Sequence, residues 1–131
     1  MDQYDRLIHD ILTKTENNLL DWDVTAAGVY ETAVLNAHRL IRAYRTTYVL
    51  GEQKYTLLFL ESKVDRFDEL GELYEGRGFE LLVLGEDKIP VFNLYDGVVE
   101  LEDLVKLSSL LQDHNTQAKR FFAEFEKAFV R

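Results

Sequence analysis

Apolar residues recur at three- and four-residue intervals near the N-terminus, and this spacing predicts a helix over residues 3–18. The apolar positions on one face of this helix are Tyr4, Leu7, Ile8, Ile11 and Leu12. The polar run TENN follows, and its side chains compete for backbone hydrogen bonds. We therefore expect Asn17 or Asn18 to close the helix in the left-handed conformation.

The period then changes to two in the stretch LLDWDV, which is typical of a half-buried strand. This alternation places Trp22, the only tryptophan, on the inner side of the strand, against the first helix. Asp21 and Asp23 point the other way. The pattern favours Trp22 as an anchor of the core, because no convergent polar group accompanies it.

Strand-prone residues continue through the middle of the chain. YETAVL (30–35) and HRLIRAYR (38–45) flank Asn36-Ala37, which suits a tight hairpin. YVL and KYTLLFLES then flank GEQ, which predicts a hairpin or a bulge around Gly51.

Helical spacing returns in DRFDELGELYEG, and it predicts a short inserted helix over residues 65–76. Asp65 is suited to begin this helix and Gly76 to end it, although Gly71 weakens its middle.

The stretch from residue 79 to residue 95 predicts a hairpin, because FELLVL and IPVFNLY flank the polar turn GEDK. Pro90 falls near the start of the second strand, where a missing donor is tolerated. From Val99 onward the spacing is helical again, and Thr116 is placed to begin a last helix after an interruption at DHNT.

This order of elements predicts an α+β fold in one domain, residues 1–131. We expect an N-terminal helix, an antiparallel sheet of about five to six strands, the inserted helix, and a C-terminal helix or helix pair. Two stretches, Leu12–Trp22 and Phe79–Leu111, resemble a type of small bacterial α+β domain with which no activity is associated. The segment from Thr46 to Gly76 is longer than in that type. The matching residues are core and turn residues, so the resemblance implies a fold and carries no functional residue.

Charge narrows the choice of partner. The chain of 131 residues has 15 basic and 24 acidic residues, a net charge of −9, and no cysteine. This balance disfavours general binding to nucleic acid or to an anionic membrane. It is compatible with a basic protein partner, and it is equally explained by an acidic surface that keeps the protein soluble. No apolar run is long enough to span a bilayer, the N-terminus lacks the pattern of a secretion signal, and the absence of cysteine fits a reducing compartment. We therefore expect a cytoplasmic protein.

Catalytic and metal-binding patterns are not evident in the sequence. The histidines His9, His38 and His114 are far apart and lack metal-ligand spacing. The best carboxylate pair, Asp21 with Asp23, is more typical of the solvent side of a sheet. We therefore predict no catalytic residue, no metal and no cofactor.

Basic residues recur in HRLIRAYR, where Arg39, Arg42 and Arg45 occur without any acid. In a strand, Arg42 and Tyr44 share one face, and an arginine beside a tyrosine can bind a carboxylate or a phosphate. These arginines either pair with the excess acids of the chain or bind an anionic ligand or an acidic partner.

Phenylalanines recur in the C-terminal segment TQAKRFFAEFEKAFVR. On a helix, Phe121, Phe125 and Phe129 form one stripe, with Phe122 beside it. Either this stripe docks on the sheet and completes the core, or it forms a homodimer or partner surface.

These patterns favour a non-catalytic protein-binding module of bacterial or phage origin. An immunity protein, an antitoxin or a small regulator, with a role in phage defence among the options, fits the acidity and the size of the chain. The alternative is a sensor or enzyme for a small anionic, nucleotide-like ligand that uses the arginine strand. Under either hypothesis, the candidate residues for contact with the partner or ligand are Arg39, Arg42, Tyr44, Arg45, Phe121, Phe122, Phe125 and Phe129.

Overall fold

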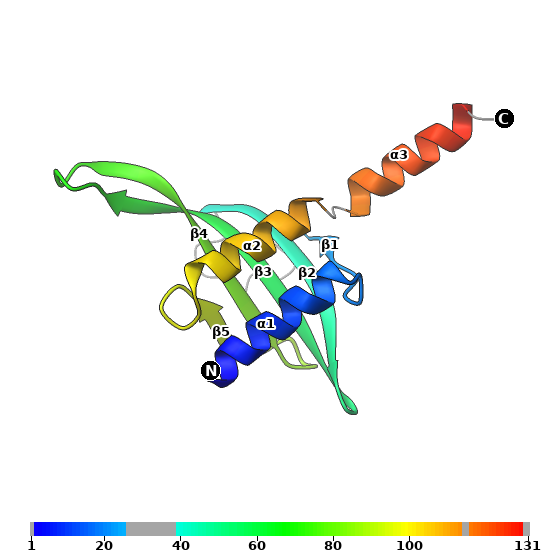
Figure 1. Ribbon diagram of the computed structural model, residues 1–131, viewed down its shortest axis with the longest axis horizontal. Helices are drawn as coiled ribbons and strands as arrows, with labels where there is room; N and C mark the ends of the chain where they lie inside the picture. The colour runs from blue at the N-terminus through cyan, green and yellow to red at the C-terminus, as the bar shows by residue number, and fades with distance from the viewer. Residues whose placement is uncertain (1, 26–38, 114–115, 130–131) are drawn as a thin grey trace.

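The computed structural model describes residues 2–25, 39–113 and 116–129. Within them, an N-terminal helix, an antiparallel sheet of five strands and two C-terminal helices form an α+β arrangement, as the sequence predicts (Figure 1). The strands follow one another in the sheet in the order β1-β2-β3-β4-β5. The predicted strand at 30–35 and the hairpin at Asn36-Ala37 lie outside the described residues.

Helix α1 spans Gln3–Glu16 and packs on one face of the sheet. Asp2 caps its start by accepting a hydrogen bond from the Asp5 backbone N–H at 2.9 Å. Asn17 is the C-cap, and Asn18 has a φ of 58°, so the predicted left-handed closure is confirmed.

Trp22 lies in the core, directly before β1 (Asp23–Val24). Its indole N–H donates to the Thr15 hydroxyl at 3.1 Å, and that hydroxyl donates to the Ile11 carbonyl at 2.7 Å. The predicted packing of Trp22 against the first helix is therefore confirmed, although the strand is shorter than LLDWDV implies.

Three long strands form the centre of the sheet: β2 (Leu40–Leu50), β3 (Gln53–Phe67) and β4 (Leu73–Leu84). β2 and β3 form the predicted hairpin at Gly51, which has a φ of 60°. β4 and β5 (Pro90–Tyr95) form the second predicted hairpin, and β5 begins at Pro90.

The predicted helix over residues 65–76 is wrong. Residues up to Phe67 continue β3, residues from Leu73 onward form β4, and the two strands pair from Thr56↔Leu84 to Phe67↔Leu73. Asp68 forms the turn by accepting hydrogen bonds from the backbone N–H groups of Leu70 and Glu72 at 2.9 and 2.8 Å. Gly71 has a φ of 79°, a conformation that a helix interior does not use.

Helix α2 (Leu101–Asp113) lies beside α1, and both cover the same face of the sheet (Figure 1). Ion pairs join the two helices, His9 with Asp103 at 3.2 Å and Lys106 with Glu16 at 2.9 Å. The fully buried residues between these helices and the sheet include Ile8, Ile11, Leu57, Phe59, Leu81, Leu94, Leu104 and Leu107. A smaller cluster on the opposite face contains Ala43, Leu58, Leu60, Leu82 and Leu84.

Helix α3 (Thr116–Phe129) projects from the body of the molecule, and its near end lies beside β1 (Figure 1). No helix in the described part of the chain is long and apolar enough to cross a membrane.

Candidate interaction surfaces

The arginines of HRLIRAYR are largely engaged by acids of the same chain. Arg39 makes two hydrogen bonds to the carboxylate of Asp65, at 2.9 and 3.2 Å. This bidentate contact raises the pKa of Arg39 and lowers the pKa of Asp65. Arg42 lies 3.5 Å from the Glu61 carboxylate. Arg39 and Arg42 of the basic run therefore each face a carboxylate of β3.

The other two candidates on this strand differ in accessibility. Arg45 is exposed and lies opposite Asp23 in the register of β1 and β2. Tyr44 is buried with the core residues beneath the helices. As predicted, Arg42 and Tyr44 share one face, but a bulge between Leu40 and Arg42 places Leu40 on the other face with Ala43.

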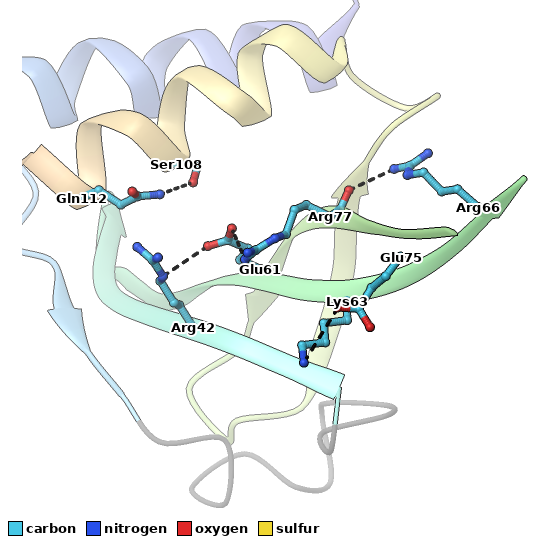
Figure 2. Close-up of polar contacts among 8 residues, drawn as sticks. All are labelled: Arg42, Glu61, Lys63, Arg66, Glu75, Arg77, Ser108 and Gln112. Carbon is cyan, nitrogen blue, oxygen red and sulfur yellow. Dashed lines mark hydrogen bonds and ion pairs between the residues drawn. The ribbon is translucent and has the colours of Figure 1, made fainter. Parts of the chain in front are cut away.

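Glu61 is a buried carboxylate between two arginines, and the sequence pattern did not single it out. Its side chain is 8% exposed, and Arg77 donates to its Oε1 at 3.2 Å while Arg42 lies 3.5 Å from its Oε2. Figure 2 shows Arg42 and Arg77 converging on Glu61 from the neighbouring strands. Because the strand alternation places Glu61 on the same face as Phe59, this network lies on the side that α2 covers. It ties β2, β3 and β4 together where the sheet narrows.

A hollow of about 560 Å³ lies on the sheet near the same place. It is lined by Arg39, Ser62, Lys63, Val64, Asp65, Gly78, Phe79, Glu80, Asn93 and Tyr95. Gly78 permits the close approach of the strands here, because a Cβ at this position would lie 2.7 Å from a methyl group of Val64. Its charged side chains are already paired: Arg39 with Asp65, Lys63 with Glu75 at 3.8 Å, and Glu80 with Asn93 at 2.8 Å. An anionic ligand would compete with these carboxylates.

A polar network also connects α1 to β2. Tyr48 donates a hydrogen bond to the Asp10 carboxylate, Lys14 lies 3.0 Å from the same carboxylate, and the Lys14 ammonium is 4.7 Å from the centre of the Tyr48 ring. Burial alone would raise the pKa of Asp10, but the hydrogen bonds from Tyr48 and Lys14 outweigh it and lower that pKa. Burial and the bond to Asp10 raise the pKa of Tyr48. These contacts hold the helix on the sheet.

The phenylalanines of α3 lie on the surface. Phe121, Phe122 and Phe125 are 62%, 61% and 51% exposed. The Phe121 ring contacts those of Phe122 and Phe125, with centroids 5.3 and 6.2 Å apart, so the three form one aromatic patch. Of the two alternatives, docking in the core does not hold for these three residues, and a partner surface stays a prediction. α3 includes Phe129, but the position of its side chain lies outside the described residues.

A second exposed apolar region was missed because it lies where a helix was predicted. β2 pairs with β3 only as far as Ser62, and β5 pairs with β4 only as far as Glu80. Residues 63–77 therefore project as a two-stranded hairpin, called the arm below, which Figure 1 shows extending from the sheet. Its exposed apolar residues are Phe67 (71%), Leu70 (86%), Leu73 (62%) and Tyr74 (49%).

No group of three or more metal-ligating side chains occurs in the part of the chain that the structure describes. Asp21 and Asp23 flank Trp22 at the edge strand, and Asp21 is exposed. No family model matches the chain, and no curated protein or solved structure matches it either.

Proposed function

We propose that this protein is a non-catalytic protein-binding module that associates through the phenylalanine patch of α3, formed by Phe121, Phe122 and Phe125. The observation that carries the proposal is that each of these three residues is more than half exposed, on a helix that projects from the body of the molecule. Burying a phenylalanine side chain stabilises an assembly by roughly 1.5–3 kcal/mol. Three adjacent rings therefore supply enough apolar surface to hold a partner.

The spacing of the rings supports a helix-in-groove mode of recognition. Phe121 and Phe125 are one turn apart, and Phe122 adds a neighbouring position, which is how amphipathic helices present anchors to a groove. Phenylalanine is also enriched in the buried centres of protein interfaces. Large exposed apolar patches on otherwise charged proteins are typical of such contacts.

Net charge supports a role in recognition for the rest of the molecule as well. Residues 116–131 contain four basic and two acidic residues, a net charge of +2. Because the whole chain has a net charge of −9, residues 1–115 have a net charge of −11. An acidic surface of this strength accelerates encounter with a partner that has a basic surface. An immunity protein, an antitoxin or a small regulator of bacterial or phage origin is the class of module that we propose.

A photo-crosslinking experiment in the native cells tests this proposal. A photoreactive phenylalanine analogue is placed at position 122 or 125, and the matched control carries it at Tyr95, an aromatic residue on β5 that is 46% exposed. We expect a discrete protein adduct from positions 122 and 125 that is absent at position 95 and is lost when Phe121→Ser is added. Adducts that are the same at all three positions, or that form at none, would contradict the proposal.

A further inference from the structure

Two exposed apolar surfaces lie at opposite ends of the molecule, the α3 patch and the tip of the arm (Figure 1). At the arm, Phe67 and Leu73 are directly opposite each other in the register, so their side chains share one face. Leu70, at the tip, is the most exposed large apolar residue among those described. The two surfaces are of similar chemistry, and neither is covered by the described part of the chain.

Each of these elements lacks the packing that normally stabilises it. An isolated two-stranded hairpin is marginally stable in water, and the arm has no third strand beside it among the described residues. A helix of 14 residues is also marginal unless its apolar face is packed. A contact between the two would stabilise both.

Charge complementarity favours the same contact. The arm, residues 63–77, contains five acidic residues against Lys63, Arg66 and Arg77, a net charge of −2. Residues 116–131 carry +2, which is opposite in sign both to the arm and to the rest of the chain. Two copies of this acidic protein would therefore attract each other most strongly where α3 of one meets the arm of the other.

The same contact within one chain is disfavoured by the connection. α3 begins three residues after α2 ends, and an extended chain spans only about 3.3–3.6 Å per residue. Figure 1 shows α3 and the arm extending in opposite directions from the body. A second molecule, in contrast, can bring its arm to α3 without any change in either fold.

We propose that α3 docks on the arm of a second copy of this chain, and that the exchange is reciprocal, so that each molecule of a twofold dimer supplies one α3 and one arm. Reciprocity closes the assembly, whereas a one-sided head-to-tail contact would continue into an open filament. This inference rests on the proposed function, since it identifies the partner of the α3 patch.

Disulfide trapping between two different single-cysteine variants tests the contact directly, because the chain has no cysteine of its own. One variant is Ala128→Cys, at an exposed position of α3 that leaves every phenylalanine in place, and the other is Glu69→Cys, in the exposed turn of the arm. The matched control replaces the second variant with Glu52→Cys, in the exposed turn of the β2–β3 hairpin. A disulfide between two different chains reports only contacts between molecules.

We expect the mixed disulfide of Ala128→Cys with Glu69→Cys to dominate under mild oxidation, and we expect the Glu52→Cys control to give little product. Adding Phe125→Ser on α3 or Leu70→Ser on the arm should abolish the product. Both residues are more than half exposed, so these changes leave the fold intact. Sedimentation should show twice the chain mass for the unmodified protein and the mass of one chain for either serine variant.

Three results would overturn the proposal. The first is a disulfide formed only between two copies of Ala128→Cys, which would mean that the helices pair with each other. The second is equal trapping by the Glu52→Cys control. The third is a monomer that gives no trapped product. The proposed function and the dimer can be distinguished experimentally.

If the photoreactive residue at position 122 captures a different protein while the purified chain is monomeric, the proposed protein-binding function is supported and the proposed dimer is contradicted.

Discussion

Helices α2 and α3 are nearly equal in length, 13 and 14 residues, and both are amphipathic. The apolar face of α2 is buried, whereas that of α3 is exposed. α2 buries Leu104, Leu107 and Leu111 against the sheet, and each is at most 1% exposed. α3 leaves Phe121 and Phe125 more than half exposed. An amphipathic pattern therefore predicts a helix with an apolar face, but it does not say whether that face is buried within the same molecule.

The largest expected effect on stability comes from truncating an apolar side chain of α2, and the same truncation in α3 is its comparison. Leu107→Ala in α2 should lower the free energy of unfolding by about 2–5 kcal/mol, because it leaves a cavity in a closed core. Phe125→Ala in α3 should change it by less than about 0.5 kcal/mol in the monomer. Urea unfolding at dilute concentration measures both, and equal losses would contradict the contrast between the two helices.

The second comparison is between two carboxylates of the same hairpin. Glu61→Gln removes the charge that Arg42 and Arg77 approach, and it should cost about 1.5–3 kcal/mol, as for hydrogen bonds to charged groups. Glu75→Gln is the matched control on the arm, where the ion pair with Lys63 is exposed and contributes about 0–1 kcal/mol. The same urea titration would refute this account if the control cost as much as Glu61→Gln.

The third prediction concerns the anchor between α1 and Trp22. Thr15→Val preserves the shape of the side chain but removes the acceptor of the indole N–H, and it should cost about 1 kcal/mol. Thr13→Val, at an exposed position two residues earlier, is the control and should cost less. Because Trp22 is the only tryptophan, its fluorescence can follow the unfolding of each variant. A larger loss of stability from Thr13→Val than from Thr15→Val would argue against a contribution from the hydrogen bond.

The smallest expected effect is a pH dependence at the surface of α1. The folded state lowers the pKa of Asp10, so the stability that this group contributes is present above its ordinary pKa of about 4 and is lost as the pH falls through the lower, folded value. Asp10→Asn should therefore flatten the fall in stability below about pH 4. Thermal unfolding of both proteins from neutral to acidic pH checks this, and identical slopes would show that the network with Tyr48 contributes nothing.

Much of the fold could be predicted because its signals are local. Trp22, the hairpin with Pro90, and the spacing of α2 each follow from a period or a turn residue that the structure confirms. The arm could not be predicted because it is exposed on both faces, so it lacks the alternation of a half-buried strand. Its apolar residues fell by chance at helical spacing, and Gly71 was the one signal of a turn.

The candidate surfaces were predicted only in part, for a different reason. The spacing of the phenylalanines identified the stripe on α3, but it did not indicate that the stripe would stay exposed. The pairing of Arg39 with Asp65 joins residues 26 positions apart, and sequence alone left that alternative open. Glu61 gave no signal at all, because one acid within an apolar strand reveals its role only when Arg42 and Arg77 are placed around it.

The most direct test of the central claim, that α3 serves a partner and not its own core, is the free energy of unfolding of residues 1–113. Measured by urea at dilute concentration and followed by Trp22 fluorescence, it should equal that of the full chain within about 0.5 kcal/mol. The native emission of the buried tryptophan should also be unchanged. A truncated chain that is unfolded, or that has lost several kcal/mol of stability, would show that α3 belongs to the core and would contradict the account.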